Sequence, residues 1–504
     1  MPAAVLDPGL LLVLAVMLPA TGAVAALALP GRWAGRIAFG LWPLGLAVAV
    51  AVAWTVWVGG APLHYAVGGW APPLGLMLRA DGPSALMLLI AAIVIGAAGL
   101  YARADLRPEP GASESRAATV FWTLMMSLWS ALNAVALGGD LFNLYVALEL
   151  LTFSAIPLVC LGGSAKTLQA ALRYLVFALV GSVLYLLGTA LLYGTYGTLD
   201  IVLLAGRTGP EPAAILACAL MIAGLAAKTA LFPLHLWLPP AHAGAPPAAS
   251  AVLSGLVVKG SFFLIARLWF DVMPGLSTAM AANLIGALGA GAILAGSVMA
   301  LRQARLKLMI AYSTVAQIGY LFLMVPLLFG VPQAEIAASA AWSGGWLQLA
   351  SHALAKAAMF LAAGLIAEAA GHDRIHGLDG VGRAVPVAVL AFTLAGLSLV
   401  GLPPSGGFAA KWLLLSASVA TGQWWWAAVM IAGGLLAAFY LFPVIGRAYA
   451  DGTAAFARPR DARLREFVVL ALAVAAALLG LSQLYPPGLL QIGLGIGLAG
   501  AGVP

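Results

Sequence analysis

Apolar runs of about 20 residues recur along the whole chain, each the length of a helix that crosses a bilayer. Of the 504 residues, 63% are hydrophobic and only 8% are charged, which excludes the soluble classes of protein. Because a helix satisfies its own backbone hydrogen bonds in lipid, we expect an all-α polytopic membrane protein. The first run has no basic region before it and no clear cleavage site after it, so we interpret it as a retained helix rather than a signal peptide.

The runs predict about 14 transmembrane spans at roughly 20 residues each. In chain order they lie at residues 10–29, 38–58, 82–101, 117–137, 142–162, 169–193, 213–247, 250–268, 278–300, 307–329, 338–369, 385–420, 424–446 and 467–484.

The formal charge of +7 reflects how the basic residues are distributed between the loops. Loops after odd-numbered spans are rich in arginine, as in the segment Arg458–Arg465, whereas loops after even-numbered spans hold only Arg79, Arg207 and Arg267. By the positive-inside rule the odd loops are cytoplasmic, which places both termini on the outer face. The charge therefore indicates topology, and we expect no nucleic-acid partner.

Five charged residues fall inside apolar runs: Glu149, Lys228, Lys259, Lys356 and Lys411. A cation at the centre of a bilayer costs roughly 3 kcal/mol even on lenient insertion scales, so it must face a protein interior or a water path. A row of buried amines with one acid favours a protein that moves ions.

Two spans are interrupted by proline and glycine, at 233–247 and 401–408. Irregular backbone at membrane depth is tolerated only where it is buried in protein or lines a polar cavity. Each break has a lysine beside it, Lys228 or Lys411. A helix that ends there leaves carbonyl groups unpaired, which favours a nearby ammonium such as that of Lys228. The prolines at the breaks are Pro233, Pro239, Pro240, Pro403 and Pro404.

The positions of the breaks predict an internal repeat. If spans 4–8 and 9–13 form two five-helix units, each break falls in the fourth helix of its unit. Because each unit has an odd number of helices, the two units have opposite orientations in the membrane and are inverted repeats. The predicted parts are a three-helix segment at 1–116, repeats at 117–268 and 278–446, and a C-terminal helix and tail at 447–504. Proline kinks at packing points are the alternative.

The two cysteines, Cys160 and Cys218, lie singly in apolar runs. No cysteine motif for a metal, an iron–sulfur cluster or a redox dithiol is present in the sequence. We therefore expect no metal site and no cofactor in this chain.

Five segments in order, between residues 117 and 420, resemble a known family: GDLFNLYVALELLTFSAIPLVCLGG, KTALFPLHLWLPPAHAGAPPAASAVLSGLVVKG, LKLMIAYSTVAQIGY, SHALAKAAMFLAAG and GLPPSGGFAAKW. They are similar to the antiporter-like membrane subunits of respiratory complex I, of Mrp cation/proton antiporters and of membrane-bound hydrogenases. The first segment most resembles the D subunit of Mrp antiporters.

The resemblance implies a proton pathway made of Glu149, Lys228, Lys259, His352, Lys356 and Lys411, in that order. His242, in the first break, is a further candidate relay or a lining residue. Gln317 stands where some members of the family carry histidine. Because an amide cannot take up a proton at neutral pH, that step must pass by water or bypass the span.

These residues also have structural interpretations. Glu149 and a lysine could form a buried ion pair without a transport role, although such pairs are poor stabilising devices. We expect His235 to pack at the break and Glu368 to be a solvated charge at the end of its span.

The resemblance implies a proton-translocating subunit of a multisubunit complex in the cell membrane of a bacterium or archaeon. Its partners would be other membrane subunits, including a second antiporter-like one, with H⁺ and either Na⁺ or K⁺ as transported ions. Mrp-type antiport is the first interpretation, and a proton-pumping subunit of a NADH-quinone oxidoreductase or hydrogenase is the second. In neither do we expect catalytic chemistry in this chain. A quinone-binding or electron-transfer subunit and a stand-alone solute carrier are more remote alternatives.

Overall fold

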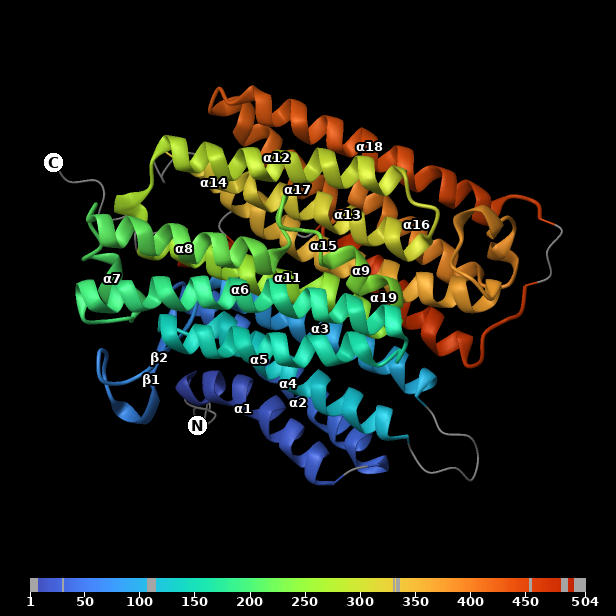
Figure 1. Ribbon diagram of the computed structural model, residues 1–504, viewed down its shortest axis with the longest axis horizontal. Coiled ribbons are helices and arrows are strands. Elements are labelled where there is room, and N and C mark those ends of the chain that lie inside the picture. Colours follow the sequence, from blue (N-terminus) through green and yellow to red (C-terminus); the bar gives the residue numbers. More distant parts are fainter. Residues whose placement is uncertain are drawn as a thin grey trace.

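The computed structural model describes residues 8–29, 31–106, 115–329, 331, 336–452, 456–481 and 488–493. Within these ranges the chain is a bundle of long helices that run side by side, with their ends gathered at two opposite faces (Figure 1). Twelve of the described helices are long and apolar enough to cross a membrane. The prediction of a polytopic α-helical membrane protein is confirmed.

The first part of the bundle includes the helices on either side of the first break. They are α1 (Pro8–Ala28), α2 (Arg32–Gly59), α3 (Gly82–Asp105), α4 (Arg116–Leu137), α5 (Leu141–Cys160), α6 (Ala165–Tyr196), the short α7 (Ile201–Ala205), α8 (Pro212–Thr229), α9 (Leu238–Gly244), α10 (Pro247–Val252) and α11 (Val258–Arg267).

The second part contains the longest helix and the second break. Its helices are α12 (Ala279–Leu301), α13 (Leu306–Phe322), α14 (Met324–Leu328), α15 (Ile336–Ala370), α16 (Pro386–Val400), α17 (Gly406–Ala420), α18 (Trp424–Tyr449) and α19 (Ala462–Leu478).

Both predicted breaks are present. The first separates α8 from α9 between Thr229 and Leu238, and the second separates α16 from α17 between Val400 and Gly406. The inverted relation of the two units and the domain limits stay predictions.

Helix α15 lies at the centre of the bundle and contacts α3, α10, α13, α16, α17 and α19 (Figure 1). Its residues from Ala340 to Ile366 are buried all round. A polar side chain in that segment therefore meets other protein atoms rather than lipid, which makes α15 the natural position for a buried polar pathway.

The structure adds one small sheet to the helical fold. Strands β1 (Leu63–Ala66) and β2 (Met77–Ala80) pair antiparallel and lie at the same end of the bundle as α7 (Figure 1). The hairpin follows α2 and leads into α3. Its backbone also pairs with the segment before α5, through the bridge between Leu78 and Gly138.

One assignment from the loop charges is wrong. The count of loop charges includes Arg267, although the predicted span 250–268 contains it; the residue is the last of α11 and is only 9% exposed. Helix α11 continues there as a π-helical turn, Leu268–Val272, so the arginine lies inside the protein rather than after the span. Two buried carboxylates compensate its charge, as described below. The tail at 485–504 is predicted on the outer face, and apart from residues 488–493 it lies outside the described residues.

Candidate functional site

Lys228 occupies the last turn of α8, directly before the first break. Ala230 ends the helix in the left-handed conformation, and the indole Nε1 of Trp237 donates to the carbonyl oxygen of Ala227 at 2.9 Å. Tyr174 of α6 stacks on Trp237 with ring centroids 4.1 Å apart. Aromatic side chains therefore pack against the break. One carbonyl oxygen at the end of α8 accepts a hydrogen bond from a side chain.

The ammonium of Lys228 meets the carboxylate of Glu149 across the helix interface. Lys228 Nζ lies 3.0 Å from Glu149 Oε1 and 3.0 Å from the hydroxyl of Thr152, both on α5. Ser182 of α6 donates to the same carboxylate oxygen. The Lys228 side chain is 6% exposed and that of Glu149 16%, so the pair is held by its own contacts rather than by solvent.

A close approach of α6 and α8 fixes this geometry. Gly181 and Gly224 face one another so closely that a Cβ on either would lie within 2.6 Å of the other's carbonyl oxygen. A Cβ on Gly181 would also approach Cγ of Lys228 to 3.1 Å. The two glycines thus let α8 bring Lys228 beside α5 and α6 without a side chain in between.

A small cavity lies between Lys228 and α11. Its volume is about 10 Å³, and it is lined by Thr152, Tyr174, Lys228 and Ser261 among others. This is close to the smallest space that holds one water molecule. The cavity therefore offers a polar step from the Glu149–Lys228 pair towards the helix that carries Lys259.

Lys259 is completely buried at the start of α11. The turn before it, Leu253–Val257, is π-helical, and Lys259 Nζ donates to the main-chain oxygen of Ser254 in that turn. The hydroxyl of Ser254 is 2.8 Å from that of Thr314 on α13. Ser254 thus joins the lysine to the neighbouring helix.

Lys356 on α15 reaches the same part of α13 from the other side. Its Nζ donates to the main-chain oxygen of Ile310 at 2.9 Å and to the hydroxyl of Ser313. Thr314 Oγ1 donates to that Ile310 oxygen at 3.1 Å. Lys259 and Lys356 are therefore both tied to the same turn of α13: Lys259 through Ser254, whose hydroxyl contacts Thr314, and Lys356 through Ile310 and Ser313.

Two of the three buried histidines in the described part of the chain, His242 and His352, lie beside these side chains. His352 is 1% exposed and His242 of α9 is not exposed at all, and both ring nitrogens of each lack a hydrogen-bond partner among the described residues. His242 stacks on Phe360 of α15 at 4.5 Å. Because no protein group holds these ring nitrogens, either imidazole is free to hydrogen-bond a water molecule or to exchange a proton.

Lys411 lies on α17, after the second break, and points back to the end of α16. Its Nζ is 2.5 Å from the main-chain oxygen of Leu399 and 3.2 Å from that of Val400, the last residues of α16. The ammonium also lies 4.4 Å from the ring centroid of Tyr320. Lys411 therefore caps the negative end of the broken helix, whereas the partners of Lys228 are side chains.

Gln317 on α13 connects the end of α16, where Lys411 binds, to α15. Its amide donates to the Leu399 oxygen at 3.0 Å, the acceptor that Lys411 also uses, and its own oxygen accepts from Gln348 at 3.0 Å. Gln348, His352 and Lys356 are four residues apart on α15 and so share one face of that helix. The amide pair thus completes a polar line from Lys356 to Lys411.

The structure therefore brings most of the predicted residues into one buried line, in which only the first is half-buried: Glu149, Lys228, Lys259, His352, Lys356, Gln317 and Lys411. Gln317 was named in advance, whereas the other linking side chains, Thr152, Ser254, Ser313, Thr314 and Gln348, were not predicted. The sequence carried one usable signal, since Thr152 is three residues after Glu149 and shares its helical face.

The outcome for two other residues is mixed. His235 packs at the first break as expected, stacked on Phe232 at 5.6 Å. Glu368 is 44% exposed but is not simply solvated, because it pairs with Arg465 at 2.7 Å. Among the described residues, no group of histidine, cysteine, aspartate and glutamate side chains is suited to hold a metal ion.

A second charged cluster, at the hairpin end of the bundle, was not predicted. Asp81 accepts hydrogen bonds from Arg79 at 2.8 Å and from Arg267 at 2.6 and 2.7 Å, and both arginines also bond Asp271 at 3.0 Å. Burial alone raises the pKa of Asp81, but Arg267 and Arg79 outweigh it and lower that pKa to about 2. The cluster balances two cations with two anions and fastens β2 to the end of α11.

Comparisons with known proteins agree with this architecture. The sequence model of the family described as NADH:quinone oxidoreductase/Mrp antiporter, TM, matches residues 138–437, more than half of the chain. The chain belongs to this family. The match spans α5 to α18 and so includes every residue of the buried line.

Two groups of relatives are similar over most of the chain. The N subunit of NADH-quinone oxidoreductase from Desulforudis audaxviator is 34% identical over 408 residues, which cover 80% of this chain and 78% of the relative. The D subunit of the Na(+)/H(+) antiporter from Bacillus subtilis is 27% identical over 386 residues, covering 76% of this chain and 75% of the relative.

Solved structures of both kinds of complex are also similar to this chain. A chain of the Mrp complex from Dietzia superposes with a TM-score of 0.83 at 26% identity, over 97% of this chain and 99% of that one. A chain of respiratory complex I from Thermus thermophilus superposes with a TM-score of 0.80 at 25% identity, over 97% and 98%. The chain is thus an antiporter-like membrane subunit of the kind present in both complexes.

Proposed function

We propose that this chain translocates protons along the buried line from Glu149 and Lys228, through Lys259, His352 and Lys356, to Lys411. The observation that carries the proposal is the group of hydroxyl side chains, Ser254, Thr314 and Ser313, that lies between Lys259 and Lys356, because a hydroxyl can both donate and accept a proton. Burying two ammonium groups in an apolar interior costs free energy. Polar groups between the two lysines are expected if protons pass from one lysine to the other.

The Glu149–Lys228 pair acts as the switch. While the two side chains are 3.0 Å apart, the carboxylate stabilises the charged amine. When the pair opens, Lys228 loses that stabilisation and its proton becomes available to the next site. Because neighbouring cationic sites repel one another, the protonation of one lysine lowers the proton affinity of the next, and the line titrates as a coupled set.

Gln317 contributes a hydrogen-bonding step rather than a protonation step. Its contacts to Gln348 and to the Leu399 oxygen keep the line polar between Lys356 and Lys411. Proton transfer past Gln317 then depends on water beside the amide pair, while His352 and Lys411 bind the proton before and after it.

We further propose that the chain works beside other membrane subunits, including a second antiporter-like one, in the cell membrane of a bacterium or archaeon, with both termini on the outer face. An Mrp-type complex that exchanges H⁺ for Na⁺ or K⁺ is the first setting, supported by the similarity to the Mrp chain over nearly its full length. A redox-driven proton pump is the second, supported by the 34% identity to an N subunit of NADH-quinone oxidoreductase.

Flux through the purified complex tests the proposal. Reconstituted in vesicles that contain a pH-sensitive dye, the wild-type complex should move protons when an ion gradient or its redox substrate is supplied. Glu149→Gln should abolish this flux. Glu211→Gln is the matched control, because Glu211 is exposed in the loop before α8 and lies outside the line. Normal flux in assembled Glu149→Gln protein would contradict the proposal.

The driving force separates the two settings. Flux that requires Na⁺ or K⁺ and proceeds without a reductant supports antiport, whereas flux that requires a reductant and a quinone supports a redox pump. The subunits that co-purify with the chain should agree with that result.

A further inference from the structure

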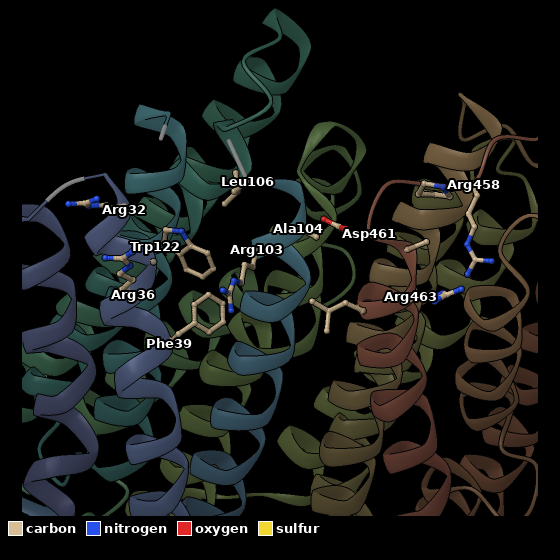
Figure 2. Close-up of a pocket in the computed structure, with 14 residues that line it drawn as sticks. Arg32, Arg36, Phe39, Arg103, Ala104, Leu106, Trp122, Arg458, Asp461 and Arg463 are labelled. Atoms are coloured by element: carbon tan, nitrogen blue, oxygen red, sulfur yellow. The ribbon is translucent and has the colours of Figure 1, made fainter. Parts of the chain in front are cut away.

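A large cavity in the described part of the chain lies away from the proton line, at the end of the bundle where α2 and α4 begin and α3 ends (Figure 2). Its volume is about 1000 Å³. Figure 2 shows two walls: one carries Arg32, Arg36 and Arg103, and the other carries Arg458 and Arg463 from the segment around the start of α19. Residues far apart in the sequence thus bring five arginines around one space.

Most of this positive charge has no protein counter-charge. Arg458 pairs with Glu466 at 2.8 Å. Among the described residues, Arg32, Arg36, Arg103 and Arg463 form no ion pair. Asp461 is the one acidic side chain that the described lining contains. The described lining of the cavity therefore carries a net positive charge, which favours an anionic occupant.

The floor of the cavity is aromatic rather than polar. Phe39 and Trp122 meet edge to face with ring centroids 5.1 Å apart, and the guanidinium of Arg103 lies 5.1 Å from the Phe39 ring. Arg36 similarly lies 5.1 Å from the ring of Trp33. A ligand in this space would meet charge at the rim and an apolar surface below it.

The depth of these groups fits the boundary between headgroups and acyl chains. Arg32 is the first residue of α2, Arg36 lies about 6 Å further along its axis, and Phe39 about 10 Å further, at 1.5 Å per residue. Arg103 is in the last turn of α3, and Trp122 is in the second turn of α4. Tryptophan and arginine at helix ends are typical of the membrane interface.

An ion-pair network holds the two walls in place. Arg465, in the first turn of α19, bonds Asp105 at the end of α3 at 2.5 Å and Glu368 near the end of α15 at 2.7 Å. The start of α19 is thereby fixed beside α3, so the cavity is a built feature of the fold rather than a gap between independent helices.

We propose that this cavity binds the headgroup of an anionic phospholipid, with the phosphate at Arg36 and Arg103 and the acyl chains against Phe39 and Trp122, while Arg463 in the opposite wall adds to the positive charge of the cavity. Basic pockets between helix ends are suited to phosphate-bearing headgroups, and each arginine strengthens the attraction. The inference does not depend on proton translocation, because the cavity shares no residue with the proton line.

Binding of dioleoylphosphatidylglycerol to the delipidated, purified complex tests this proposal, with native mass spectrometry in detergent as the measurement. The triple variant Arg36→Gln/Arg103→Gln/Arg463→Gln should bind at least about tenfold more weakly than wild type. The control Arg173→Gln/Arg302→Gln/Arg374→Gln removes the same charge from exposed positions on the same predicted face, outside the cavity, and should bind like wild type.

Three results would overturn the proposal. Equal binding by the two triple variants would show that the cavity arginines are not the site. Dioleoylphosphatidylcholine retained as strongly as the anionic lipid would show that charge is not recognised. Displacement of the lipid by inorganic phosphate at a similar concentration would identify a small-anion site instead. If the triple variant does not assemble, the single variants Arg36→Gln and Arg463→Gln replace it, with Arg302→Gln as their control.

Discussion

Lys411 on α17 donates a hydrogen bond to the main-chain oxygen of Leu399, 2.5 Å away, across the gap that divides its span into two helices. The same oxygen accepts from Gln317 at 3.0 Å. At the end of α16, the Leu399 oxygen therefore accepts hydrogen bonds from both an ammonium group and an amide. The contact with Lys411 is the last protein contact of the proposed pathway.

The first prediction separates a relay from a structural role at Lys411. If Lys411 releases protons, Lys411→Ala should stop flux without loss of assembly, whereas Lys411→Glu should retain some flux, since a carboxyl group also accepts and releases a proton. A lysine that only caps α16 predicts the opposite order, because an acid beside the negative helix end is unfavourable by about 1 kcal/mol. The measurement is reconstituted proton flux per assembled complex, and alanine outperforming glutamate would favour the capping role.

The second prediction concerns the charged cluster at the hairpin. Asp81→Asn leaves Arg79 and Arg267 with one acid between them, and breaking a buried pair in this way costs about 3–5 kcal/mol. Asp451→Asn is the control, since Asp451 is fully exposed and its pair with Arg383 at 3.4 Å is worth little. Thermal unfolding of the purified protein in detergent should show a clear drop for Asp81→Asn and almost none for Asp451→Asn; equal midpoints would show that the cluster does not hold the fold.

The third prediction is the pH dependence of that cluster. The folded-state pKa of Asp81, about 2, is below its ordinary value of 3.8, so the charged carboxylate stabilises the folded protein above about pH 4. This contribution is lost as the pH falls from about 4 towards 2. Wild-type protein should lose stability over that range by more than Asp81→Asn protein does, and parallel curves would contradict the assignment.

The fourth prediction fixes the orientation in the membrane. In a cysteine-free background, Arg460→Cys should react with a membrane-impermeant maleimide only when the cytoplasmic side is accessible. Glu211→Cys, at the other end of the bundle, should react from outside. Both positions are exposed in the structure. The reverse pattern would place the termini on the cytoplasmic face.

Much of the fold was predictable because lipid imposes simple rules on a sequence. Span lengths, the two breaks and the lysines beside them follow from the length of apolar runs and from the cost of buried charge. The contacts that link the lysines were not predictable. Helix α15 is buried on all sides over its central part, so no amphipathic pattern reveals that Gln348 faces Gln317.

Two further features depended on tertiary structure. Arg267 resembles a loop residue in the sequence because it ends an apolar run, but Asp81 and Asp271 compensate its charge inside the protein. Ser254 resembles an ordinary small residue, and only the π-helical turn that contains it directs its carbonyl oxygen to Lys259. Neither the acids that compensate Arg267 nor the role of Ser254 can be recognised from a single stretch of sequence.

Lys259 lies at the middle of the proposed line, and its removal tests the account most directly. The measurement is proton flux through the reconstituted complex for Lys259→Ala, compared with Lys166→Ala, which removes an exposed lysine at the start of α6. We predict that Lys259→Ala abolishes flux in fully assembled complex while Lys166→Ala leaves it unchanged. Flux at the wild-type rate in assembled Lys259→Ala complex would contradict a pathway that runs from Lys228 through Lys259 to Lys356.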